Sequence, residues 1–125
     1  MKFEVYREIH FSSAHRLRNY CGKCENIHGH NWRVRLCVTR KELDKTGFVM
    51  DFKDIDRILK KVTDVLDHKD LNSLEQFSQI NPTAENIACF IFNEAKKEVA
   101  ALDSEASVSK VYVWESERSC ACVEE

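Results

Sequence analysis

Glycine and proline are scarce in this sequence, which holds three glycines and one proline among 125 residues. So few chain-breaking residues leave little room for long flexible linkers, and the length suits one hydrophobic core rather than two. We therefore expect a single domain over residues 1–125. No apolar run approaches the roughly 20 residues of a membrane span, and the N-terminus lacks the apolar stretch of a signal peptide. These absences predict a cytoplasmic protein without a membrane partner.

Strong charge of either sign is also missing, since the formal net charge is −2 at pH 7. A protein that binds nucleic-acid phosphates usually carries a clear excess of lysine and arginine, so we expect no nucleic-acid partner. The sequence does hold six cysteines. In a chain without a secretory signal, they are more typical of reduced thiols, metal ligands or catalytic groups than of a disulfide framework.

Hydrophobic periodicity predicts four strands. Residues 2–12 and 28–39 alternate between apolar and polar positions, which is typical of half-buried strands. Residues 107–116 and the short piece 120–123 predict two more strands in a hairpin. Between the two pairs lies a long stretch with a different, helical period.

Two helices are predicted in that stretch. Asp51 is a suitable N-cap for the first, which should end near Asp67–His68, and Asn81 or Thr83 can cap the second. Apolar residues recur every three or four positions in each. The order ββααββ predicts an α+β fold with an antiparallel four-stranded sheet and both helices on one face. The free edges of such a sheet favour pairing between copies of the chain.

A His-x-His motif opens the second predicted strand. Because alternate side chains of a strand share a face and lie about 6–7 Å apart, His28 and His30 can bind one metal ion together. The alternative is a pair of hydrogen-bonded core histidines. Small residues at Ser12–Ala14 can bend or bulge the first strand and so re-aim His15.

Three further features are suited to chemistry near such a site. Glu115 shares the apolar side of its strand with two valines, which makes it a candidate ligand anchor unless the strand end reaches solvent there. Asp67 beside His68 can fix the tautomer of that imidazole, or His68 can simply favour a helix C-terminus. Cys24 precedes His28 by four residues, where a metal would favour the thiolate, although a structural cysteine fits the same position.

These residues together resemble the 6-pyruvoyltetrahydropterin synthase and 6-carboxytetrahydropterin synthase family. The resemblance covers nearly the whole chain and is carried, in order and spacing, by Phe11–Leu17, Cys24 with His28–His30, Leu66–His68 with Leu71–Asn72, Pro82–Asn86 and Trp114–Ser116. The bacterial 6-carboxytetrahydropterin synthases of queuosine precursor synthesis look most similar. The resemblance implies a tunnelling fold, in which trimers close their sheets into a barrel and two trimers stack into a hexamer.

The resemblance also implies roles for individual residues. The expected zinc ligands are His15, His28 and His30. The other implied roles are a general base at Cys24, a proton relay through Asp67 and His68, and a pterin contact at Glu115 with Thr83 nearby. The implied reaction converts 7,8-dihydroneopterin triphosphate to 6-carboxy-5,6,7,8-tetrahydropterin, acetaldehyde and triphosphate, or to the 6-pyruvoyl product. The implied active sites are shared between subunits of a trimer or a dimer of trimers.

Three alternatives remain open. Glu25 lies beside Cys24, and one branch of the family uses a glutamate there to form 6-hydroxymethyl-dihydropterin for folate synthesis. Cys21 and Cys24 can instead join Cys120 and Cys122 in a four-cysteine zinc site. A non-catalytic, zinc-containing module that binds pterins is the third alternative.

Overall fold

A computed structural model describes residues 1–20 and 26–125, with five strands in one sheet. The elements in chain order are β1 (Phe3–His15), β2 (His28–Arg40), α1 (Phe52–Asp64), β3 (Lys69–Asp70), the 3₁₀ turns η1 (Leu71–Ser73) and η2 (Glu75–Phe77), α2 (Ala84–Leu102), β4 (Ser107–Ser116) and β5 (Ser119–Glu124). The spatial strand order is β3-β1-β2-β4-β5. The α+β prediction is confirmed, but the four-stranded prediction missed β3, because two residues carry no periodic signal.

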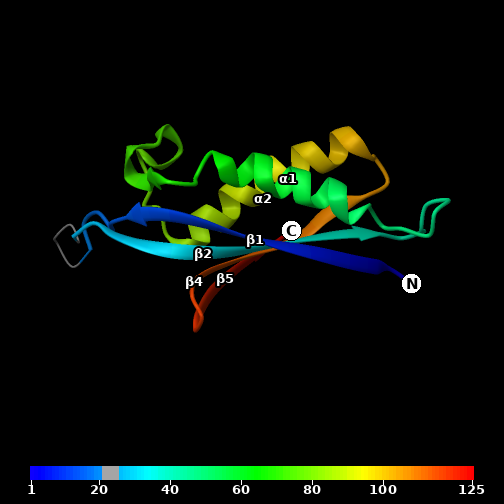
Figure 1. The fold of residues 1–125 in the computed structure, drawn as a ribbon, viewed down its shortest axis with the longest axis horizontal. Coiled ribbons are helices and arrows are strands. Elements are labelled where there is room, and N and C mark those ends of the chain that lie inside the picture. Colours follow the sequence, from blue (N-terminus) through cyan, green and yellow to red (C-terminus); the bar gives the residue numbers. More distant parts are fainter. Residues whose placement is uncertain (21–25) are drawn as a thin grey trace.

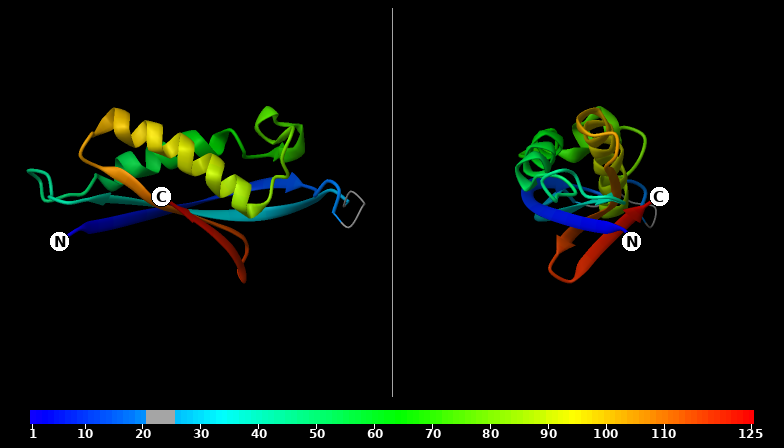
Figure 2. Two further views of the ribbon diagram at one scale, coloured as in Figure 1. Left: turned by 180° about the vertical axis from the view of Figure 1, so that it is seen from behind. Right: turned by 90° about the vertical axis from the view of Figure 1, so that its right-hand side faces the viewer.

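Both helices cover the same face of the sheet, as predicted (Figure 1). Figure 2 shows α1 and α2 side by side on one side, with the β4–β5 hairpin twisted away below them. The core lies between these layers and follows the alternation of β2, where Trp32, Val34 and Leu36 are fully buried and Arg33 and Arg35 point to the other face. Burial of this apolar face supplies the main driving force for folding.

Capping side chains set the starts of both helices. The Asp51 carboxylate accepts a hydrogen bond from the Lys53 amide at 2.9 Å, and the Thr83 hydroxyl accepts one from the Asn86 amide at 3.1 Å. Of the two predicted caps for α2, Thr83 is therefore the cap. The prediction that α1 ends near Asp67–His68 was too long, because the helix ends at Asp64 and a turn follows.

The predicted bulge before His15 is wrong. β1 and β2 pair without a break from Phe3 opposite Arg40 to His15 opposite His28. Strand alternation alone therefore places His15 on the helix-covered side, two residues beyond the buried Ser13. Irregular pairing occurs elsewhere, at Trp114–Ser116 near the end of β4 and at Cys37–Val38 in β2.

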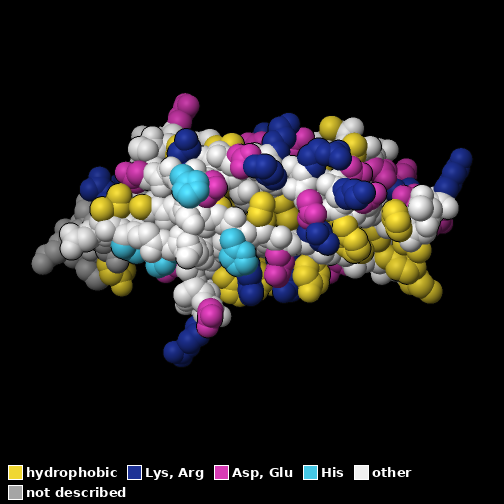
Figure 3. Space-filling view, viewed as in Figure 1, with side chains coloured by type: hydrophobic (Ala, Val, Ile, Leu, Met, Phe, Trp, Pro, Cys, Tyr) yellow, Lys and Arg dark blue, Asp and Glu magenta, His cyan; other side chains and the backbone are white. Residues whose placement is uncertain are grey.

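Both edges of the sheet have free stretches among the described residues. β3 lies beside only Ser13 and Ala14, so the edge of β1 from Phe3 to Phe11 has no neighbouring strand, and β5 forms the opposite edge. Apolar side chains gather at the surface near the N-terminal end of this edge (Figure 3, right). In the described part of the chain, no helix is long and apolar enough to cross a membrane.

The cap of α1 gives a direct test of this description. Replacing Asp51 by alanine should lower the free energy of unfolding by about 1 kcal/mol, because the Lys53 amide loses its acceptor. Asp51→Asn should keep most of the stability, because asparagine caps helices nearly as well. Denaturant unfolding of the three proteins measures this difference. An equal loss of stability in both variants would show that Asp51 stabilises the protein through its charge rather than through the capping hydrogen bond.

Candidate metal centre

Three histidines converge where β1 ends and β2 begins. His15 lies directly opposite His28 in the β1–β2 register, and His30 lies opposite Ser13. One ring nitrogen from each histidine lies within 4.8 Å of those of the other two. Histidine atoms reach the surface at this end of the sheet (Figure 3, left). Such a group of imidazoles is a donor set that suits zinc and several other divalent transition metals.

Backbone carbonyls fix the orientation of two of these rings. Nδ1 of His15 lies 2.7 Å from the Pro82 carbonyl oxygen, and Nδ1 of His28 lies 3.0 Å from the Asn26 carbonyl oxygen. Because a carbonyl can only accept, Nδ1 carries the hydrogen in each ring and Nε2 keeps a free lone pair. Metal-binding histidines are usually oriented in this way by a contact outside the metal's own ligands.

Nε2 of His15 and Nε2 of His30 are buried and have no hydrogen-bond partner among the described residues. Buried polar atoms of this kind are uncommon, because leaving them unpaired costs free energy. A metal ion bound by these nitrogens would remove that cost. The residues present therefore fit a metal ion.

Burial shields two of the three rings and favours the metal-binding form of His30. His15 is buried, with 2% of its surface exposed, and Trp32 packs edge-on against His15 and His30 at ring-centre distances of 5.0 and 5.3 Å. Desolvation is the largest effect on the pKa of His30 and lowers it. The Glu115 carboxylate opposes this less strongly, and His15 and His28 lower the pKa further by smaller amounts. A neutral imidazole is the form that binds metals, so the lowered pKa of His30 favours metal binding at neutral pH.

Glu115 joins the cluster from β4. Its two carboxylate oxygens lie 3.8 Å from Nε2 of His15 and 3.7 Å from Nε2 of His30. The side chain is 35% exposed, whereas Val111 and Val113 on the same side of β4 are fully buried. The irregular pairing of β4 with β5 at Trp114–Ser116 brackets Glu115. Bulges of this kind often re-aim a side chain beside a site.

An open cavity of about 750 Å³ connects these groups with the start of α2. Among its lining residues are His15, His28, Thr83, Glu85 and Glu115. Thr83, predicted as a contact near Glu115, therefore shares a cavity with it. A cavity with a few converging polar groups is the usual form of a small-molecule site.

Asp67 and His68 lie beside the last residues of β1. The Ser12 amide donates to Asp67 Oδ1 at 2.9 Å, and the His68 amide donates to the Ser12 carbonyl at 2.6 Å. The other Asp67 oxygen lies 3.6 Å from Nε2 of His68, whose side chain is 83% exposed. Asp67 is therefore fixed by β1, while the His68 ring is free to contact a ligand or another subunit.

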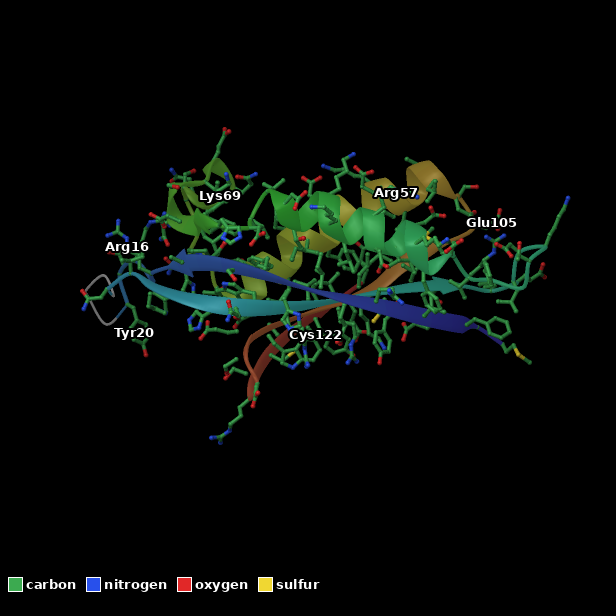
Figure 4. All side chains as sticks on the ribbon, viewed as in Figure 1. Arg16, Tyr20, Arg57, Lys69, Glu105 and Cys122 are labelled. Carbon is green, nitrogen blue, oxygen red and sulfur yellow. The ribbon has the colours of Figure 1, made fainter. Side chains whose placement is uncertain are left out.

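The cysteines of β5 lie on the face of the sheet away from the helices. Cys120 is opposite Trp114 and Cys122 is opposite Tyr112, and Figure 4 shows Cys122 below the sheet. Both thiols are exposed, and neither is bonded to another cysteine among residues 1–20 and 26–125. The other residues of the predicted alternatives, Cys21, Cys24 and Glu25, lie outside the described residues.

Sequence reasoning missed the residues that hold the loop before α2. The Arg18 guanidinium donates to three backbone carbonyls, those of Asn72, Phe77 and Ile80, at 2.7 to 3.0 Å. The Arg18 amide also donates to the side chain of Asn81 at 2.7 Å. This clamp fixes the segment that brings the Pro82 carbonyl to His15. No local pattern marks Arg18, because its partners lie 54 to 63 residues away.

Comparison with known proteins places this architecture in a family. The family model described as 6-pyruvoyl tetrahydropterin synthase matches residues 4–125. The chain belongs to this family. The resemblance seen in the sequence is thereby confirmed, and the family consists of tetrahydropterin synthases, which are lyases.

Individual relatives agree with this assignment. The chain is 32% identical to a 6-carboxy-5,6,7,8-tetrahydropterin synthase of Haemophilus influenzae, over 94% of this chain and 95% of that protein. It is 34% identical to a protein of the same name from Bacillus subtilis, over 94% and 82% of the two chains. The structure of Caenorhabditis elegans 6-pyruvoyl tetrahydropterin synthase superposes with a TM-score of 0.86 at 25% identity, covering 100% of this chain and 96% of that one. The fold is therefore the tunnelling fold of this family.

Metal analysis tests the role of the cluster. We expect one divalent ion per chain, which His28→Ala should remove, because the cluster loses one of its three converging imidazoles. The variant should keep its fold, since His28 is an exposed side chain. Elemental analysis after dialysis and circular dichroism measure the two properties.

Cys120→Ser serves as the control and should retain the metal. A full metal content in His28→Ala, combined with loss of metal in Cys120→Ser, would favour the four-cysteine site instead.

Proposed function

We propose that this protein is a zinc-dependent lyase that acts on 7,8-dihydroneopterin triphosphate in queuosine precursor synthesis. Its products would be 6-carboxy-5,6,7,8-tetrahydropterin, acetaldehyde and triphosphate. The observation that carries the proposal is the three-histidine cluster, with two Nε2 atoms unpartnered among the described residues. Its members His15 and His28 line a cavity together with Glu115. Similarity to two 6-carboxy-5,6,7,8-tetrahydropterin synthases over most of the chain supports this pterin product.

His15, His28 and His30 would hold the zinc ion. Their ring nitrogens are close enough to one another to share one ion, and three protein ligands leave a fourth position for substrate. When bound, zinc supplies a Lewis acid that makes the side-chain hydroxyls of the substrate more acidic. The chain's own contribution is to orient His15 and His28 through backbone carbonyls and to lower the pKa of His30, which favours its neutral form.

Glu115 and Thr83 would bind the pterin. A carboxylate can accept two parallel hydrogen bonds from the amino group and the adjacent ring N–H of a pterin, which fixes the orientation of the ring. The Thr83 oxygen already accepts from the Asn86 amide, so its O–H remains available to donate to a ring acceptor. Both side chains line the same cavity, which supports this assignment.

Cys24 would remove a side-chain proton as general base, and His68 and Asp67 would relay protons. The Ser12 amide holds Asp67 through one oxygen, which leaves the other, 3.6 Å from Nε2, to orient the exposed His68 ring. A carboxylate beside an imidazole stabilises the protonated ring and so aids proton transfer. Glu25 is the alternative base of the folate branch.

The active form would be a trimer or a dimer of trimers with sites shared between subunits. The free edge of β1 and the edge strand β5 are the surfaces through which neighbouring sheets can pair into a barrel. The exposed His68 ring is free to contribute to a site in a neighbouring subunit. A cytoplasmic location is supported by the four described cysteines, all of which are free thiols.

Mass spectrometry of the products formed from 7,8-dihydroneopterin triphosphate tests the proposal. Zinc-loaded protein should release 6-carboxytetrahydropterin and acetaldehyde in equal amounts. A 6-pyruvoyl product would assign the chain to the runner-up activity, and 6-hydroxymethyl-dihydropterin would assign it to the folate branch. Pterin binding without any turnover would identify a non-catalytic binding module and refute the lyase.

Two matched variants test which residue is the general base. Cys24→Ala should lower turnover by about 10²-fold or more, within the usual range for a lost general base, with zinc retained. Glu25→Gln should change turnover much less, because neighbouring residues of an extended segment tend to point to opposite sides. Steady-state rates and zinc content of both variants measure this. If Glu25→Gln is inactive while Cys24→Ala keeps its activity, Glu25 is the general base.

A further inference from the structure

We infer that Glu115 is the fourth ligand of the metal ion in the substrate-free protein and that substrate must displace it. The inference rests on the histidine metal site of the proposed function, but not on the identity of the substrate or product. It gives Glu115 two successive partners. The carboxylate closes the metal site at rest and becomes free to hold the pterin when the site opens.

Two distances at Glu115 are close to those between ligands of one ion. In a tetrahedral zinc site with bonds of about 2.0–2.1 Å, neighbouring ligand atoms lie about 3.3–3.4 Å apart. The Glu115 oxygens lie 3.8 Å from Nε2 of His15 and 3.7 Å from Nε2 of His30. Oε2 therefore lies a few tenths of an ångström beyond ligand spacing from His15, and Oε1 does so from His30, which places the carboxylate beside two of the three histidines.

The surroundings of the carboxylate support the same partner. No described residue donates a hydrogen bond to Glu115, and the two histidine nitrogens nearest to it also have no hydrogen-bond partner among the described residues. The two buried nitrogens have lost water without gaining a partner, which costs free energy, and a negative charge lies beside them. One divalent ion between them would satisfy all three groups.

The position of Glu115 in β4 also permits a substrate to displace its carboxylate from the metal ion. Val113 is fully buried and anchors the strand, whereas the Glu115 side chain is 35% exposed towards the cavity. A ligand entering the cavity can therefore reach the carboxylate without unfolding β4. Four protein ligands would make the resting ion unreactive towards water, because a closed zinc site has no open position for chemistry. Binding of a pterin by Glu115 would then open the site only when substrate is present.

Zinc affinity tests the inference without any measurement of turnover. Glu115→Gln keeps the shape of the side chain and removes its charge, and Glu85→Gln makes the same charge change at an exposed residue of the same cavity. Competition with a chromophoric chelator should show a zinc dissociation constant raised by at least about 10-fold for Glu115→Gln, a loss comparable to that seen when supporting residues of metal sites are changed. Glu85→Gln should bind zinc like the unaltered protein.

The visible spectrum of the cobalt(II)-substituted protein reports the ligands themselves. The spectrum of the unaltered protein should change when neopterin is added, and the spectrum of Glu115→Gln should differ from it before any addition. Equal zinc affinities and identical cobalt spectra for the unaltered protein and Glu115→Gln would overturn the fourth ligand. An unaltered cobalt spectrum in the presence of bound neopterin would overturn its displacement.

Two controls keep the result interpretable. Thermal melting of the metal-free proteins checks folding, and if Glu115→Gln fails to fold, Glu115→Asp withdraws the carboxylate by one methylene and gives the same test. Weakened zinc binding in the variant, in a protein that does not turn over 7,8-dihydroneopterin triphosphate, would refute the proposed reaction and leave this inference standing. Unchanged zinc affinity and an unchanged cobalt spectrum in Glu115→Gln, while the unaltered protein turns over 7,8-dihydroneopterin triphosphate, would refute this inference and leave the proposed reaction standing.

Discussion

The unbroken antiparallel pairing of β1 with β2 is the constraint on which the site depends. It places His15 opposite His28, and because strand side chains alternate, His30 falls on the same side as both. A shift of one residue in this register would turn the histidines of one strand to the opposite face. The same pairing buries Trp32, which packs against His15 and His30. Trp32 therefore belongs both to the hydrophobic core and to the wall of the metal site.

Hydrogen bonds between residues far apart in the sequence position the remaining groups of the site. The Pro82 carbonyl orients His15, and Arg18 holds the loop that carries Pro82 by donating to backbone carbonyls within it. On the other side of β1, the Ser12 backbone holds both Asp67 and His68. The end of β1 thus organises segments that lie more than 50 residues away in sequence, which explains how a small sheet can assemble a site with many functional groups.

Features with a local cause could be predicted from the sequence, and those with a distant cause could not. Alternation gave β1, β2 and the shared face of His28 and His30, and capping chemistry gave the start at Asp51. The two-residue β3 and the contact between His15 and Pro82 left no local signal, because both depend on tertiary packing. The bulge expected before His15 does not occur. Small residues there permit a bulge, but regular β1–β2 pairing gives the backbone groups more hydrogen-bond partners.

A crystal structure of the zinc-loaded protein, with anomalous diffraction recorded at the zinc edge, tests the central claim most directly. The account predicts one anomalous peak per chain, about 2.0–2.1 Å from Nε2 of His15, His28 and His30. A peak beside the β5 cysteines, with the three histidines unliganded, would contradict it.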